Sequence, residues 1–128
     1  MTALVGGFMV VMGLAIGITW ARDVLRSPEV DRSAGLLRAR DRRDGSVFWP
    51  HWVAESATAI GLVGGGIGLI AERTWAEGVA LVALGAYTST SINALGWTLA
   101  LPSRYAHAVP MVVGAAGGVA SVVVLLVR

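Results

Sequence analysis

The sequence of 128 residues contains no cysteine and no lysine, and charged residues make up only 14% of it. Without cysteine there are no disulfides, no thiolate nucleophile, no cysteine-ligated iron–sulfur cluster and no covalently attached c-type haem. Without lysine there is no Schiff base to retinal or pyridoxal phosphate. The net charge is only +2. Nucleic acid is therefore not an expected partner, because binding to it depends on many basic contacts.

The sequence also lacks the common catalytic motifs. It contains neither a G-x-S-x-G nucleophile turn nor an H-E-x-x-H zinc motif. The glycine-rich stretch GGGIG lies inside an apolar run and follows no predicted strand, so it does not match a phosphate-binding loop. We therefore assign no catalytic residue, and the sequence leaves open whether the chain is an enzyme.

Apolar residues, in contrast, are abundant, at 55% of the chain, whereas soluble domains contain about 45–50%. They form four runs, over residues 2–21, 52–71, 76–101 and 106–127. Each run has roughly the 20 residues that a helix needs to cross a bilayer. The charges lie almost wholly between the runs. The sequence therefore predicts an all-α integral membrane protein, in which residues 1–128 form a single bundle of four transmembrane helices.

Arginine is distributed unevenly among the connections. Seven of the ten arginines lie in the first connection, residues 22–48, whereas the second holds only Arg73 and the third only Arg104. Short basic loops stay on the cytoplasmic side. The charge pattern therefore predicts a cytoplasmic first loop with both termini outside. The exclusive use of arginine, with abundant alanine, glycine and valine, indicates a bacterial protein, and hence the inner membrane. Positive charge follows the first run, unlike in a signal peptide.

The first connection has the signals of a short amphipathic helix. Ser27 is a suitable N-cap, Pro28 suits the first helical position, and Glu29 suits the first turn. Gly45 can end such a helix. Acidic residues alternate with the arginines along it. Either the helix lies on the membrane surface with local ion pairs, or it is a docking surface for a partner protein.

Glycines recur at four-residue spacing in three of the four runs. Small residues at this spacing let helix backbones approach closely, which membrane helices need because lipid provides no hydrophobic drive between them. The pattern therefore predicts tight packing, within the chain or against another copy or another membrane protein. The candidate packing residues are Gly13, Gly17, Gly61, Gly65, Gly114 and Gly118.

A few polar residues lie in or beside the runs and are the candidates for a ligand site or a proton pathway. His51 and Glu55 are one helical turn apart at the start of the second run. Ser89 and Asn93 share one helix face in the third run, and Tyr87 and Ser91 share another. His107 begins the fourth run, at the same predicted membrane level as His51. The alternative is that hydroxyls bond back to their own helix and histidines mark the interface. The candidates are His51, Glu55, Ser89, Asn93 and His107.

Three functions are compatible with these features. The first is a non-catalytic accessory subunit of a larger inner-membrane complex, such as a respiratory complex, with lipids and another membrane protein or itself as partners. The second is a small oligomeric transporter or channel that uses Glu55 and Asn93. The third is a haem- or quinone-binding subunit that uses His51 and His107. A metal site of His51, Glu55 and His107 is not expected, because nothing in the spacing favours it.

Overall fold

The computed structural model describes residues 1–26, 30–31, 38–39, 42–100 and 108–127. The helices in this part of the chain are α1 (Thr2–Arg26), α2 (Arg42–Ile70), α3 (Ala76–Ala100) and α4 (Ala108–Leu126). Each contains a segment long and apolar enough to cross a membrane: Thr2–Arg22, Trp52–Ile70, Ala76–Gly96 and Ala108–Leu126. This confirms the expectation of four helices of that kind.

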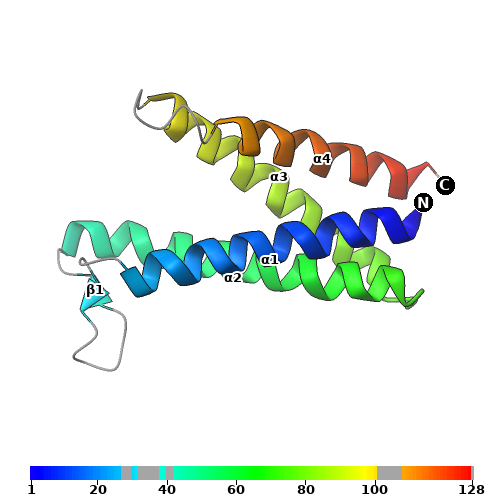
Figure 1. Ribbon diagram of the computed structural model, residues 1–128, viewed down its shortest axis with the longest axis horizontal. Helices are drawn as coiled ribbons and strands as arrows, with labels where there is room; N and C mark the ends of the chain where they lie inside the picture. Colours follow the sequence, from blue (N-terminus) through cyan, green and yellow to red (C-terminus); the bar gives the residue numbers. More distant parts are fainter. Residues whose placement is uncertain (27–29, 32–37, 40–41, 101–107, 128) are drawn as a thin grey trace.

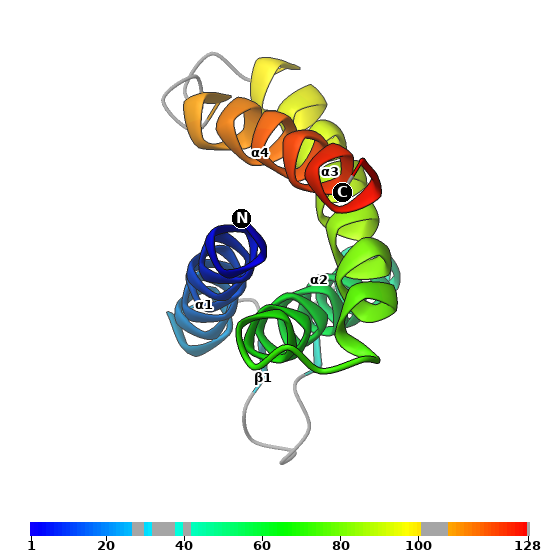
Figure 2. The ribbon, with the colours of Figure 1, turned by 90° about the vertical axis from the view of Figure 1, so that its right-hand side faces the viewer.

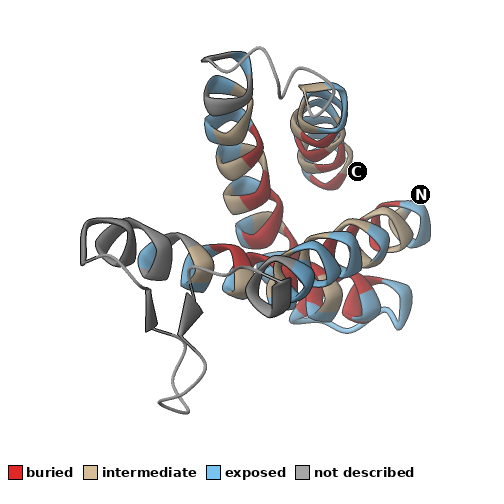
Figure 3. Cartoon of the chain, turned by 60° about the vertical axis from the view of Figure 1, so that its left-hand side comes forward, coloured by how far each residue is buried: buried red, intermediate tan, exposed pale blue. Residues whose placement is uncertain are grey.

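The helices form two hairpins, α1 with α2 and α3 with α4, which are joined by contacts between α2 and α3. The hairpins meet at the end that holds both chain termini and the turn between α2 and α3 (Figure 1). Toward the other end they diverge, and α3 leaves α2 to follow α4 (Figures 1 and 2). α1 and α4 have few contacts. The result is an open wedge, with buried residues gathered on the faces where helices meet (Figure 3).

The α1–α2 contact depends on backbone rather than on large side chains. A Cβ atom on Gly66 would lie 2.6 Å from the Gly6 carbonyl oxygen, and one on Gly6 would lie 2.7 Å from the Gly66 carbonyl oxygen. Seven residues further along α1, a Cβ atom on Gly13 would lie 2.8 Å from the Ala59 carbonyl oxygen. The Cα–H groups of these glycines therefore face carbonyl oxygens of the opposite helix, a geometry that brings weak hydrogen bonds as well as dispersion contacts.

A second face of α2 packs against α3 through glycine and alanine. A Cβ atom on Gly65 would lie 3.3 Å from the Ala80 backbone, and one on Gly61 would lie 3.2 Å from the Ala83 side chain. Ala80 is fully buried. Larger side chains, including those of Met9, Leu62 and Leu84, fill the space where α1, α2 and α3 meet. α2 is thus the central helix, because it packs on α1 with one face and on α3 with another.

The turn between α2 and α3 is closed by hydrogen bonds to the last turn of α2. The Arg73 amide donates to the Gly68 carbonyl at 2.9 Å and the Glu72 amide donates to the Leu69 carbonyl at 3.2 Å. This is a Schellman arrangement, which needs a left-handed residue that is usually glycine. Here Glu72 takes that conformation, with φ of 52°. The bonds satisfy carbonyls that would otherwise be left open at the helix end.

The expectation of a short amphipathic helix in the first connection was wrong. Val30–Asp31 and Arg38–Ala39 are the antiparallel strands β1 and β2, with Val30 opposite Ala39, so they do not belong to an amphipathic helix. An isolated helix is marginal in water, and Gly35 inside it would cost about 1 kcal/mol relative to alanine. Ser27, Pro28 and Glu29, where that helix was expected to begin, lie outside the described residues.

The second helix also begins earlier than expected, at Arg42 rather than at residue 52. Gly45, which was expected to end a helix, lies inside α2, and so does Pro50. The helix can continue through Pro50 because proline removes only one backbone donor. Its other backbone groups keep their hydrogen bonds within the helix.

The α1–α2 contact can be tested with alanine at two neighbouring glycines. Gly66→Ala should lower the free energy of unfolding by about 1–3 kcal/mol, because its Cβ atom would meet the Gly6 carbonyl and neither backbone can move alone. Gly64→Ala is the matched control, because a Cβ atom there meets nothing within 4 Å. Denaturant titration in mixed micelles measures both. Equal stability of the two variants would contradict the close contact.

Candidate functional site

A buried polar cluster lies between α2 and α3, where the helices begin to diverge. Glu55 of α2 is 8% exposed, and Tyr87 and Ser91 of α3 are each 4% exposed. The side chains of Tyr87 and Ser91 form a hydrogen bond, and Glu55 lies close enough to the Tyr87 phenol for an electrostatic interaction. Polar groups are rarely buried in apolar surroundings without partners, because desolvation is costly. The three residues therefore act as one polar unit within the helix bundle.

Glycines of α4 make room for the hydroxyl-bearing face of α3. A Cβ atom on Gly114 would collide with the Tyr87 hydroxyl and would lie 3.0 Å from the Ser91 hydroxyl oxygen. One turn along, a Cβ atom on Gly118 would collide with the Thr88 hydroxyl, which donates to the Leu84 carbonyl at 2.8 Å. The absence of side chains on α4 at these positions lets α3 keep its hydroxyls in a buried interface.

Tyr87 is also held by α1. The Phe8 ring meets it edge to face, with ring centroids 6.3 Å apart and an angle of 62° between the planes. The same Phe8 ring lies against Gly117, where a Cβ atom would be 2.7 Å away. Edge-to-face aromatic pairs are favourable by about 0.5–1.5 kcal/mol beyond the area they bury. Phe8 therefore links the first hairpin to both helices of the second.

The candidates Ser89 and Asn93 do not join this cluster. Both are exposed, on the side of α3 opposite to the face that buries Tyr87 and Ser91. They lie instead in a row of exposed residues that recur every three or four positions along α3. We call this row the α3 stripe. It consists of Gly78, Val82, Gly85, Ser89, Ile92, Asn93 and Gly96.

Sequence reasoning recognised Ser89 and Asn93 as one face but missed the stripe to which they belong. The available signal was the spacing of Gly78, Gly85 and Gly96, which are seven and eleven residues apart. Both spacings keep residues on one face of a helix. A Cβ atom on any of these three glycines would meet nothing within 4 Å. The stripe is therefore a flat, open surface with two polar residues in it.

Neither histidine candidate can be placed beside Glu55. His51 lies in α2, but its side chain is outside the described part of the structure, and His107 is outside the described residues altogether. Among the described residues there is no group of three or more His, Asp or Glu side chains that could hold a metal ion. The haem, quinone and metal hypotheses are therefore neither strengthened nor weakened by the geometry.

The candidate packing glycines fall into two groups. Most lie at helix interfaces: Gly13 against α2, Gly61 and Gly65 against α3, and Gly114 and Gly118 as described above. Gly17 is different, because a Cβ atom there would meet nothing within 4 Å. It lines an apolar groove between α1 and α2 instead.

Comparisons of the chain with protein-family models, curated proteins and solved structures found no match. The functional argument therefore depends on the residues of this chain alone. Two features stand out from a packed apolar bundle. They are the buried cluster of Glu55, Tyr87 and Ser91, and the exposed α3 stripe.

The fit between α3 and α4 can be tested with a double-mutant cycle. Gly114→Ala should destabilise the fold by about 1–3 kcal/mol, because the new methyl group displaces the Tyr87 hydroxyl. In a Tyr87→Phe background the hydroxyl is gone, so the same substitution should cost less, with a coupling of at least about 1 kcal/mol. Thermal unfolding of the four proteins in one detergent gives the coupling. Strictly additive effects would show that the hydroxyl does not lie against Gly114.

Proposed function

We propose that the chain is a non-catalytic accessory subunit of a larger membrane complex and that it binds its partner through the α3 stripe. The proposal rests on the exposure of Ser89 and Asn93 on a helix that is otherwise apolar enough to span a membrane. An amide group that faces hydrocarbon loses its hydrogen bonds to water and gains none, which is unfavourable. A neighbouring transmembrane helix with a polar side chain at the same level removes that cost.

The shape of the stripe fits a helix as the occupant. From Gly78 to Gly96 it extends about 27 Å at 1.5 Å per residue, close to the roughly 30 Å of a hydrocarbon core. Gly78, Gly85 and Gly96 leave room for the partner backbone. The alternation of three- and four-residue steps keeps the contact on one side of α3 over this whole length, as in a left-handed helix pair. The stripe thus supports an association that runs across the membrane.

We further propose that the protein resides in a bacterial inner membrane with both termini outside. The arrangement of the helices supports the proposal that the termini share one side, because they and the α2–α3 turn lie at one end and the helix ends that flank the first connection lie at the other (Figure 1). The arginine-rich end then faces the cytoplasm, in agreement with the positive-inside rule. Anionic headgroups of the cytoplasmic leaflet would meet that end.

The association can be tested by co-purification of the tagged full chain in mild detergent, followed by mass spectrometry. We expect a larger membrane protein in stoichiometric amount. Asn93→Leu and Ser89→Leu should each lower the retained partner by about three- to tenfold, the loss expected for one interhelical polar contact. The reason is that either change removes a hydrogen-bonding group from the α3 stripe, and the new leucine side chain is still compatible with a membrane-facing surface.

Thr19→Leu is the control for this experiment. Thr19 is an exposed hydroxyl residue on another helix, and it already donates to the Ala15 carbonyl at 2.8 Å. Its replacement should leave the retained partner unchanged. Purification of the wild-type chain alone, or as a pure homo-oligomer, would contradict the accessory role. An equal loss for Thr19→Leu would show that any change on the membrane-facing surface weakens the complex.

The buried carboxyl of Glu55 favours a second function, that of a small oligomeric transporter. An ionisable side chain within a span, buried among Tyr87 and Ser91, is a functional candidate because the membrane makes it costly to keep. If Glu55 carries an ion or a proton, Glu55→Gln should abolish flux in vesicles that contain the purified protein. Asn93→Ala should leave it intact, because Asn93 faces away from the cluster. Unchanged flux in Glu55→Gln would exclude this function.

A further inference from the structure

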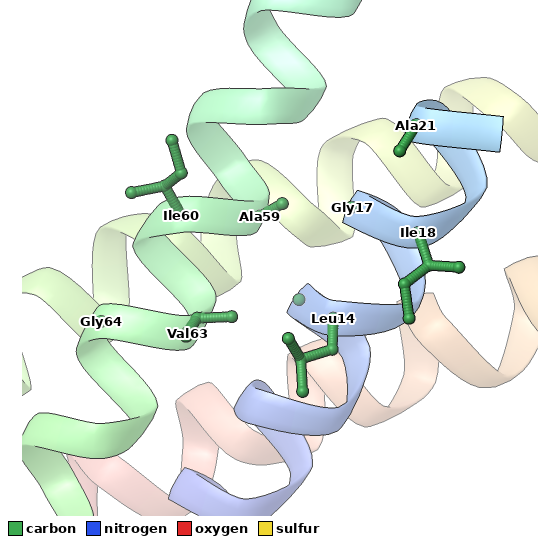
Figure 4. A pocket seen from close by; sticks show the side chains of 9 residues that line it. Leu14, Gly17, Ile18, Ala21, Ala59, Ile60, Val63 and Gly64 are labelled. Atoms are coloured by element: carbon green, nitrogen blue, oxygen red, sulfur yellow. The ribbon is translucent and has the colours of Figure 1, made fainter. Parts of the chain in front are cut away.

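An apolar groove lies between α1 and α2 in the half of the hairpin next to the first connection. It comprises two neighbouring hollows of about 530 Å³ and about 410 Å³, which share four lining residues. We call it the α1–α2 groove. In Figure 4, Ala59 and Val63 of α2 extend toward Leu14 and Gly17 of α1 across it. The shared lining residues are Gly17, Ala21, Ala59 and Ile60.

The groove begins where the close backbone contact of the two helices ends. At Gly13 the helices touch, because a Cβ atom there would meet the Ala59 carbonyl oxygen. One turn later, at Gly17, a Cβ atom would meet nothing within 4 Å, and the same holds for Gly64 across the groove. Both glycines are exposed. Small residues on both helices therefore leave the space along this lining unfilled.

The length of the groove matches one leaflet rather than a whole bilayer. Its lining runs from Gly13 to Ala21 on α1 and from Trp52 to Gly64 on α2. At 1.5 Å per residue these segments are about 12 Å and 18 Å long. Half of a hydrocarbon core is about 15 Å. A transmembrane helix that crossed the whole bilayer would extend well past this lining, whereas one acyl chain that enters from the nearer surface would match its length.

The open end of the groove has the residues that a phospholipid headgroup would meet. Trp20 and Trp52 line it and lie at the ends of their candidate spans, where aromatic residues favour the membrane interface. The Ser56 hydroxyl is beside them. Arg22, which directly follows the lining residue Ala21, is exposed. An exposed cation at this level attracts an anionic phosphate group.

We propose that the α1–α2 groove binds one anionic phospholipid from the leaflet at the Trp20 and Trp52 end. One acyl chain occupies the groove between Leu14, Ile18 and Val63, and the phosphate group pairs with Arg22. This site is independent of the α3 stripe, which lies on a different helix and extends over about twice the length of one leaflet.

The site can be tested by native mass spectrometry of the full chain released from nanodiscs made of equal amounts of dioleoyl phosphatidylglycerol and dioleoyl phosphatidylcholine. The wild-type protein should retain one phosphatidylglycerol. Gly17→Leu places a side chain in the groove and should lower that retention about tenfold, as expected when two or more methylene groups lose their contacts. Arg22→Gln should remove the preference for phosphatidylglycerol. The two lipids have the same acyl chains, so without the cation the groove should bind both equally.

Two further variants make the outcome unambiguous. Gly7→Leu is the matched control, because Gly7 is on the same helix, has nothing within 4 Å of a Cβ atom and does not line the groove; it should retain lipid like the wild type. Gly64→Leu fills the groove from the other side and should reproduce Gly17→Leu, should that variant fail to fold. Equal retention in the filled variants and Gly7→Leu would overturn the proposal. So would a polypeptide that photo-crosslinks to Ile18 in place of lipid.

Discussion

The fold depends on the distance to which the backbones of α1 and α2 approach each other. Gly6 and Gly66 bring their carbonyl oxygens within reach of each other's Cα–H groups, and the Ala59 carbonyl oxygen lies against Gly13. In lipid the apolar surface of a helix gains little by leaving its surroundings, so contact must come from dispersion and from such weak polar interactions. Both decline steeply with distance. Glycine at positions 6 and 66 therefore stabilises the α1–α2 contact more than large side chains there would.

The close contact with α1 at one face of α2 determines which face of α2 is left for α3. Because α1 occupies the face of Gly66, α3 packs on the face of Gly61 and Gly65, and its hydroxyl-bearing residues turn toward α4. Tyr87 and Ser91 are then buried and Ser89 and Asn93 are left outside. The inner polar cluster and the outer polar stripe are thus two consequences of one rotational setting of α3. A rotation of α3 by half a turn would exchange them.

The four helices could be predicted from the sequence, because a run of about twenty apolar residues has few other stable structures. The face that each helix buries could not. α3 has polar residues on both sides, so its hydrophobic pattern does not define an inner face, and Asn93 was equally compatible with a cavity and with the surface. That choice is made by the glycines of α4, which are distant in sequence. The start of α2 was also missed, since Gly45 and Pro50 look like helix boundaries when helix packing is unknown.

The hairpins consist of neighbours in sequence, and this bears on how the chain assembles. α1 meets α2 and α3 meets α4 across single connections, so each pair can form as soon as its two helices have been synthesised. The Phe8 ring, in contrast, lies against Gly117, nearly the full length of the chain away. That contact is complete only after the last helix is made. Contacts between α2 and α3 join the hairpins earlier, and the contact of Phe8 with Gly117 adds a direct link between the first helix and the last.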